Sequence, residues 1–321
     1  MSAISNASSR CTKPPRQRGA ALLMAILTVA LIALISSAIV AEHGAAIEQL
    51  GGRSDQAQAR WLARAAGDWI RNVLEFDQKR TGNVDHLREE WSIPVSNLPI
   101  DEEGRVSGEI IDQSGRFNIN TLVVQGVRDP AQQAIFERLL EALDVSPKQA
   151  ESLVDAVTDW IDTDSEPLAR GAEAAWYAGQ QQKIMPPNAP IISIKELLAV
   201  SGMTPQLLER LRPHIAALPA EATRINVNTA SAEVLSAFVS NLSLATARQI
   251  VLTRANKYFR NVADFTGQLP ASSSYNAAQF DVQSLYFMAT GRARWGDATT
   301  HMQILLRRNL PRPDIIYETI L

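Results

Sequence analysis

The sequence has few of the residues that build disulfides, metal cages or phosphate-binding surfaces. Cys11 is the one cysteine in 321 residues, so no disulfide forms within the chain, and zinc ribbons or fingers are excluded. Lys and Arg do not outnumber Asp and Glu, 31 against 34, which argues against binding to nucleic acid or another polyanion. The histidines are too far apart along the sequence to indicate a zinc site: His43, His86, His214 and His301.

Motifs of the common enzyme classes are also missing. The sequence has no G-x-S-x-G nucleophile elbow and no phosphate-binding loop. We therefore expect no catalytic activity. The enzyme alternative is a membrane-anchored hydrolase that uses acidic residues, and a paired Ser nucleophile and His base would be its sign.

Apolar residues gather near the start of the chain. Ala20 to Ala41 carries no charged side chain, and as a helix it would reach about 33 Å, enough to cross a bilayer. The residues before it include Arg10, Lys13, Arg16 and Arg18 and no acid, which predicts a cytoplasmic N-terminus. The alternative is a secretory signal peptide that is removed near Ser36 to Ala38.

The junction at Gly19 resembles the processing site of type IV prepilin-like proteins, with Arg16-Gln17-Arg18-Gly19 directly before the apolar run. In that family a prepilin peptidase cuts after the glycine, here between Gly19 and Ala20, and methylates the new N-terminus. Pilins usually carry Glu at the fifth mature position, which is Met24 in this chain. Among the pseudopilins of type II secretion, the K subunit is the one that lacks this Glu.

The rest of the chain reads as a small sheet that is interrupted by helices. Helical spacing continues from Glu42 to about Phe76, and Val106 to Asp112 has the pattern of a strand. Strand character returns in Leu285 to Ala289 and His301 to Arg307, with Gly291 and Gly296 between them. The helices expected between these strands cover 129–143, 146–161, 193–200, 204–216, 230–240, 243–255 and 261–267.

This order of elements predicts an α+β fold: a pilin-like N-terminal transmembrane helix, a small antiparallel sheet, and a large all-α domain inserted into the sheet. The predicted segments are a leader (1–19), a transmembrane helix (20–41), a pilin-like helix with the first strands (42–125), the inserted α-domain (126–280) and the C-terminal strands that complete the sheet (281–321).

A short internal repeat lies within the helical region. Phe117 to Thr121 and Ile225 to Thr229 both place Asn at alternating positions before Thr, a pattern that caps a following helix and bonds local backbone. The second copy opens a unit that resembles the helix-hairpin-helix or SAM-like type. Some such units bind DNA through a glycine-bearing hairpin, but the hairpin Asn241 to Leu244 has no glycine. A membrane-anchored DNA-binding protein of the competence type is the alternative function. Because the hairpin has no glycine, we expect no nucleic acid as a partner.

Acidic residues concentrate between positions 151 and 173. Asp155, Asp159 and Asp162 have the spacing of one helix face, and Asp164 follows in the next turn. Like charges at this density repel, and a hard divalent cation with oxygen ligands would remove the repulsion. The pattern is not an EF-hand, because Pro167 stands where the glycine belongs. A solvated acidic face is the alternative.

The same segment resembles that of the K-type minor pseudopilins of type II secretion. The shared features are Asp159 to Asp164, then Gly171-Ala172-Glu173 and Trp176-Tyr177. In that family the α-domain binds calcium, so the resemblance implies a calcium site with four candidate ligands: Asp159, Asp162, Asp164 and Glu173. The family usually has another acid directly after the Glu, whereas this chain has Ala174, so the number of ions stays open.

The resemblance extends over nearly the whole chain after the leader and implies a function. It implies a minor pseudopilin at the tip of the pseudopilus, with the C-terminal domain in the periplasm and one helix in the bacterial inner membrane. The implied partners are the minor pseudopilins of the I and J types, the major pseudopilin filament, the prepilin peptidase and the inner-membrane secretion platform.

Overall fold

The computed structural model describes residues 18–180, 184–309 and 311–321, with backbone alone for residues 18–19 and 44–47. The leader predicted at 1–19 therefore lies almost wholly outside the described residues. The chain divides into two compact units, residues 1–57 and 58–321. Helix α1 (Arg18–Thr81) begins in the first unit and ends in the second.

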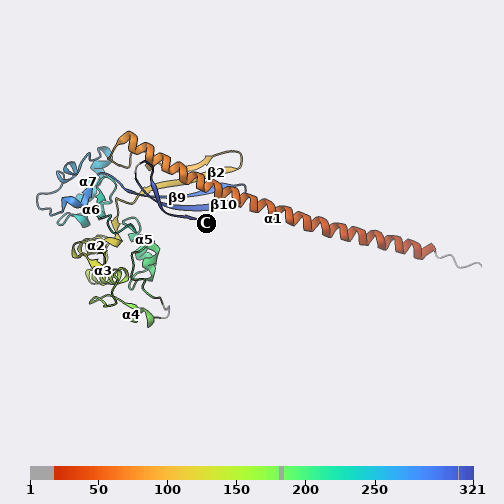
Figure 1. Ribbon diagram of the computed structural model, residues 1–321, viewed down its shortest axis with the longest axis horizontal. Coiled ribbons are helices and arrows are strands. Elements are labelled where there is room, and N and C mark those ends of the chain that lie inside the picture. Colours follow the sequence, from red (N-terminus) through yellow and green to blue (C-terminus); the bar gives the residue numbers. More distant parts are fainter. Residues whose placement is uncertain (1–17, 181–183, 310) are drawn as a thin grey trace, which may run out of the picture. The chain divides into compact units, whose positions relative to one another are not determined.

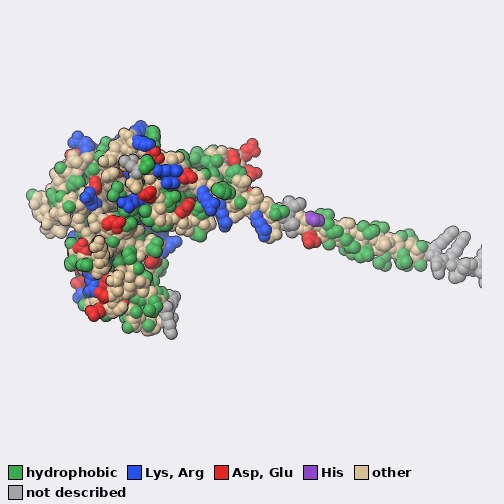
Figure 2. Space-filling view, in the orientation of Figure 1, with side chains coloured by type: hydrophobic (Ala, Val, Ile, Leu, Met, Phe, Trp, Pro, Cys, Tyr) green, Lys and Arg blue, Asp and Glu red, His purple; other side chains and the backbone are tan. Residues whose placement is uncertain are grey.

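The first unit contains the apolar part of α1. Every side chain from residue 20 to residue 43 is exposed, and Figure 2 shows the hydrophobic side chains that cover this stretch. Within the described residues this is the one helix long and apolar enough to cross a membrane, which fits a single-pass anchor. The helix is continuous through Gly51 and Gly52, although two adjacent glycines are expected to weaken a helix.

A five-stranded antiparallel sheet organises the second unit (Figure 1), with the strand order β1-β2-β9-β10-β11. The strands are β1 (Val95–Pro99), β2 (Gly104–Asp112), β9 (Tyr286–Trp295), β10 (Ala298–Arg307) and β11 (Asp314–Ile320). Strands β2 and β9 pair along their length, from Gly104 opposite Trp295 to Asp112 opposite Phe287. The chain leaves the sheet after Asp112 and returns at Tyr286, so a long insert separates two neighbouring strands.

The C-terminal part of α1 packs on this sheet through one face. Leu62, Ala66, Ile70 and Leu74 recur every four residues and are buried in a cluster with sheet residues that include Phe287, Ile304 and Leu306. Gly67 permits the close approach, because a Cβ at this position would lie 2.7 Å from Ile304 Cδ1. The helix and the sheet therefore share one apolar core.

The insert is mostly helical. Its helices are α2 (Pro130–Ala142), α3 (Pro147–Ile161), α4 (Ala174–Ala178), α5 (Pro205–Leu211), α6 (Ala232–Phe238), α7 (Leu244–Asn256) and α8 (Val262–Thr266). Its 3-10 helices are η2 (Ile119–Leu122), η3 (Ile194–Ala199) and η4 (Ala277–Gln279), and η1 (Glu90–Ser92) precedes the sheet. Its short strands are β3 (Phe117–Asn118), β4 (Val123–Val124), β5 (Val127–Arg128), β6 (Ile215–Ala216), β7 (Ile225–Asn226) and β8 (Phe280–Asp281).

The sequence predicts neither α4 nor the short strands of the insert, and it differs from the structure in further places. The helix expected over 204–216 ends at Leu211, because Pro213 has no N–H to donate to a helical hydrogen bond. Residues 194–199 form a 3-10 helix, and the edge strands β1 and β11 were not predicted. Gly291 lies inside β9 opposite Gly108, whereas only Gly296 lies in the turn before β10.

The two halves of the insert are closed in the same way. Strand β3 pairs in parallel with β6, and β7 pairs in parallel with β8. In each half the first Asn of the repeated motif accepts a hydrogen bond from the backbone N–H two residues ahead: Asn118 from Asn120 at 3.2 Å, and Asn226 from Asn228 at 2.8 Å. The local bonding expected of the motif is confirmed at these two residues.

The second Asn of each motif makes a reciprocal pair of hydrogen bonds with the backbone of one distant residue. Asn120 accepts from the N–H of Ile191 at 2.8 Å and donates to its carbonyl at 2.9 Å. Asn228 makes the same reciprocal pair with Phe259, at 2.8 Å in both directions. The short sequence repeat therefore marks equivalent positions in two similar structural units.

Candidate metal site

The acidic loop connects α3 to α4. Helix α3 ends at Ile161, and Asp162 already has an extended backbone, with φ −69° and ψ 166°. The expectation that Asp162 shares a helix face with Asp155 and Asp159 is therefore wrong, because Asp162 lies beyond the helical turn. Glu173 closes the loop as the N-cap of α4, where its Oε2 accepts from the N–H of Ala174 at 3.3 Å.

Three of the four predicted ligands come together in this loop. Asp162, Asp164 and Glu173 each offer one carboxylate oxygen, and these oxygens lie within 4.8 Å of one another. Calcium binds oxygen at about 2.3–2.6 Å, so oxygens around one ion are no more than about 5 Å apart. Asp162 and Glu173 are buried, at 1% and 4% exposure, while the Asp164 side chain is 55% exposed.

Two buried oxygens in this group have no hydrogen-bond partner in the described part of the chain: Asp162 Oδ1 and Glu173 Oε1. Burial raises the pKa of both carboxyls, and neighbouring acids raise it further. A buried carboxylate oxygen without a partner is destabilising, and a cation between the carboxylates would supply what they lack. The donor set fits a hard divalent cation.

Asp159 is not part of this group of three. Its two carboxylate oxygens accept from the N–H of Leu168 at 3.2 and 3.0 Å, and the residue is fully buried. Burial raises its pKa to about 6. Gly171 lies directly against it, because a Cβ at Gly171 would lie 1.9 Å from Asp159 Oδ2. Asp159 therefore holds the shape of the loop.

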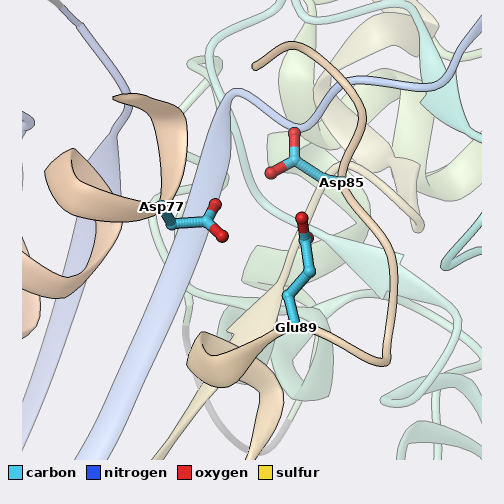
Figure 3. Close-up of side chains that lie close together, drawn as sticks. All are labelled: Asp77, Asp85 and Glu89. Carbon is cyan, nitrogen blue, oxygen red and sulfur yellow. The ribbon is translucent and has the colours of Figure 1, made fainter. Parts of the chain in front are cut away.

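A second acidic group lies near the end of α1. Figure 3 shows the carboxylates of Asp77, Asp85 and Glu89 pointing toward one another, from α1 and from the segment that follows it. The buried guanidinium of Arg308 pairs with Asp85 and, at 2.9 Å, with Asp77. Because Arg308 already pairs with two of the three carboxylates, and Glu89 accepts from the Trp91 ring N–H, we assign this group to a buried polar cluster. Sequence reasoning missed it, since its members are far apart along the chain.

An apolar groove of about 300 Å³ lies between α1 and strands β1 and β2. Trp69, Ile93 and Ile100 line it with exposures of 50%, 65% and 51%. Trp69 falls at the three- and four-residue spacing of the apolar helix residues, which predicts that it packs, but the structure leaves its side chain half exposed. Apolar side chains exposed together are typical of interaction surfaces.

The two arginines of α7 make contacts within the insert and so are not free to bind phosphate. Arg254 is buried and donates to the carbonyls of Val227 and Ala230. Arg248 pairs with Glu233 at 3.6 Å. These contacts leave the hairpin between the two helices without the basic character that DNA binding requires.

Two family models match the chain, at residues 115–220 and 225–283, and both describe type II secretion system protein K. The Klebsiella pneumoniae type II secretion system protein K is 33% identical over 306 residues, covering 91% of this chain and 93% of the relative. The Pectobacterium carotovorum protein of the same name is 33% identical over 305 residues, with 91% and 92% coverage. The chain belongs to the type II secretion system protein K family.

The fold of this chain is similar to that of one chain in a solved structure, the GspK-GspI-GspJ complex from enterotoxigenic Escherichia coli. The matched chain has a TM-score of 0.74 and 22% identity, and the match covers 85% of this chain and 99% of that one. The two family models correspond to the two halves of the insert, the first containing β3 and β6 and the second β7 and β8. The DNA-binding alternative is not supported.

Three residues predicted for processing and filament position lie in the first turns of α1: Gly19, Ala20 and Met24. The Met24 side chain is 74% exposed. A mature chain that started at Ala20 would keep the whole apolar part of the helix.

Proposed function

We propose that the chain is the minor pseudopilin that caps the tip of the type II secretion pseudopilus and supports export of folded proteins across the outer membrane. The observation that carries this proposal is the insertion between β2 and β9. It attaches a second domain to the sheet of a subunit whose N-terminal helix is of the pilin type. A shaft subunit repeats along a helix, and this bulk would obstruct a copy stacked above it.

The partners proposed for the chain are minor pseudopilins of the I and J types, together with the major pseudopilin filament and the inner-membrane platform. The solved neighbour is a complex of GspK with GspI and GspJ. The groove lined by Trp69, Ile93 and Ile100 is an exposed apolar surface that offers room for apolar side chains of such a partner.

The proposed location is the bacterial inner membrane, crossed once, with the N-terminus in the cytoplasm and the C-terminal domain in the periplasm. The basic leader supports this orientation. The prepilin peptidase would cut between Gly19 and Ala20 and methylate Ala20. We assign the chain no catalytic role, and we interpret α6 and α7 as a helix-hairpin-helix or SAM-like unit that serves packing.

We infer that the acidic loop binds calcium. Asp162, Asp164 and Glu173 would supply ligands, and Asp159 would hold the loop through the N–H of Leu168. When bound, the ion supplies positive charge to a buried site that holds unpaired carboxylate oxygens. Titration of the chain with calcium measures the number of ions bound.

Secretion tests the function directly. Deleting the gene should leave exoproteins trapped in the periplasm, and the wild-type chain should restore their release. A chain with both Trp69→Ala and Ile93→Ala should fail to restore it, because the apolar groove loses two of its exposed side chains. The control is Leu252→Ala, which removes an apolar side chain that is 60% exposed on α7. Normal secretion without the chain would contradict the proposal.

Melting of the purified chain tests the ion. Wild type should melt higher in calcium than in chelator, because an ion that binds only the folded state stabilises it by RT ln(1 + [L]/Kd). Asp162→Ala combined with Asp164→Ala should abolish the difference, whereas Glu166→Ala, an exposed acid of the same loop, should keep it. An unchanged melting temperature for wild type would leave only a solvated acidic face.

A further inference from the structure

Arg128 contacts two of the three grouped carboxylates. Its Nε lies 3.0 Å from Asp162 Oδ2, and its Nη2 lies 3.4 Å from Asp164 Oδ2. Asp162 is 1% exposed, whereas 31% of the Arg128 side chain is exposed. A partly exposed cation from outside the loop therefore contacts one buried and one exposed candidate ligand.

A tight hairpin places Arg128 at this position. Strands β4 and β5 are joined by Gln125 and Gly126, which have φ of 52° and 75°, the left-handed pair that a two-residue hairpin turn requires. A Cβ on Gly126 would lie 3.4 Å from Thr163 Oγ1, so the turn lies against the acidic loop. The backbone therefore fixes Arg128 beside Asp162, although 34 residues separate them.

We propose that Arg128 is an internal counter-cation that competes with the divalent ion for Asp162 and Asp164 and so sets the affinity of the site. This inference rests on the proposed calcium site. The guanidinium occupies Asp162 Oδ2 and Asp164 Oδ2 but leaves Asp162 Oδ1 and Glu173 Oε1 without partners. Two buried oxygens, Asp162 Oδ1 and Glu173 Oε1, are therefore free to bind an ion. The ion competes with the arginine for the negative charge of Asp162 and Asp164.

The cluster around Arg308 shows why Arg128 can yield to an ion. Arg308 has no exposed side-chain surface and is bound by Asp77 and Asp85, and Glu89 Oε1 is the one carboxylate oxygen there without a partner among the described residues. The Arg308 side chain is fully buried, so it stays within its cluster. Arg128 is partly exposed and lies beside two free oxygens, so it moves outward when an ion takes its place.

This arrangement gives the loop two neutralised states. Without calcium, the guanidinium limits the repulsion between Asp162 and Asp164, so the loop keeps its fold. With calcium, the ion takes both carboxylates and the arginine side chain returns to water. The affinity is then lower than the carboxylates alone would give, which restricts binding to environments rich in calcium.

Calorimetric titration of CaCl2 into the full chain, purified in detergent, tests the proposal. Arg128→Met should bind calcium about tenfold more tightly than wild type, equivalent to about 1.4 kcal/mol. Arg128→Gln, which keeps hydrogen-bond donors but no charge, should tighten binding similarly and serves if the Met variant folds poorly. Arg128→Lys keeps the charge and should stay within about threefold of wild type. The control is Arg170→Met, which removes a cation of the same loop that pairs with Glu151.

The outcomes separate this proposal from the calcium site itself. Binding by Arg128→Met and Arg128→Gln that equals or falls below that of wild type would overturn the role of Arg128, because the arginine would then be organising the ligands. Calcium binding by neither wild type nor any variant would remove the calcium site and this proposal with it. Binding by the neutral variants alone would support the counter-cation and show that the native chain excludes the ion. In chelator, Arg128→Met should melt below wild type, since the carboxylates lose their counter-charge.

Discussion

Ser284 donates a hydrogen bond of 2.6 Å from its hydroxyl to Oδ2 of Asp112, although 172 residues separate the two. Asp112 is the last residue of β2, and Ser284 lies two residues before β9. The bond therefore joins the two ends of the insert, a junction that we call its neck. Thr229, from the second half of the insert, donates to the same oxygen. One buried carboxylate therefore joins the sheet to the inserted domain, and burial raises the pKa of that carboxyl.

Asp112→Ala should loosen this neck. Ser284 Oγ and the N–H of Ser114 would lose their acceptor, and Thr229 Oγ1 would keep only the carbonyl of Asn226, so we expect a loss of roughly 2–4 kcal/mol in the free energy of unfolding. Urea denaturation of the full chain measures it. Glu318→Ala, at an exposed position on β11, should change the midpoint little. Equal midpoints for the two variants would show that the neck is held by other contacts.

Stability should fall as pH rises from about 4 to about 7. Burial raises the pKa of Asp85 to about 7 against the attraction of Arg308, so the folded chain retains a proton that the unfolded chain releases near pH 4. The free energy of unfolding therefore decreases from about pH 4 to about pH 7 and levels off above it.

Asp85→Asn should reduce this slope, because the asparagine does not titrate and its side-chain oxygen still faces the N–H of Ser284. Urea unfolding at several pH values measures the slope. Asp297→Asn, in the exposed turn between β9 and β10, is the matched control and should keep the slope of wild type. A slope unaffected by Asp85→Asn would assign the pH dependence to other carboxyls.

Gly171→Ala should disturb the acidic loop. The new Cβ would lie 1.9 Å from Asp159 Oδ2, so the carboxylate must move away from the N–H of Leu168. We expect a destabilisation of roughly 2–4 kcal/mol and a smaller rise in melting temperature on adding calcium. Gly179→Ala is the control, since its Cβ would meet its nearest atom at 3.4 Å. Thermal melts with calcium and with chelator compare the two, and indistinguishable curves would refute the tight contact.

Processing should depend on Gly19. N-terminal sequencing of the membrane form should begin at Ala20, and Gly19→Val should keep the leader, because a branched side chain does not fit where the peptidase accepts glycine. Ala25→Val, beyond the junction, should be cut normally. A mature chain that begins near Ile39 would instead indicate a secretory signal peptide and contradict the pilin-like start.

The chain should be present at about one copy per filament, at the tip. Restoring the usual carboxylate with Met24→Glu should not move it into the shaft, because the insert would still obstruct stacking. Quantitative cross-linking of assembled pseudopili measures its contacts and its ratio to the major subunit. Contacts between copies along the shaft, at a ratio near that of the major subunit, would show that the tip position is wrong.

Features that depend on neighbouring residues could be predicted from the sequence alone. The apolar run from Ala20 to Ala41 marks the membrane helix, because length and hydropathy are local properties. Asp129-Pro130 and Thr204-Pro205 mark helix starts, and both caps accept the expected backbone N–H groups. The acids of the loop lie close together in sequence, so three of the four candidate ligands could be named.

Only the tertiary structure decided which distant side chains meet these local features. Nothing in the sequence places Arg128 at Asp162 or Arg308 between Asp77 and Asp85, since the pairing follows from a hairpin turn and from the register of strands that the insert separates. The same holds for Trp69. Its helical spacing matches that of buried neighbours, but only the position of the sheet beneath α1 determines which part of the helix face is covered and which part stays open.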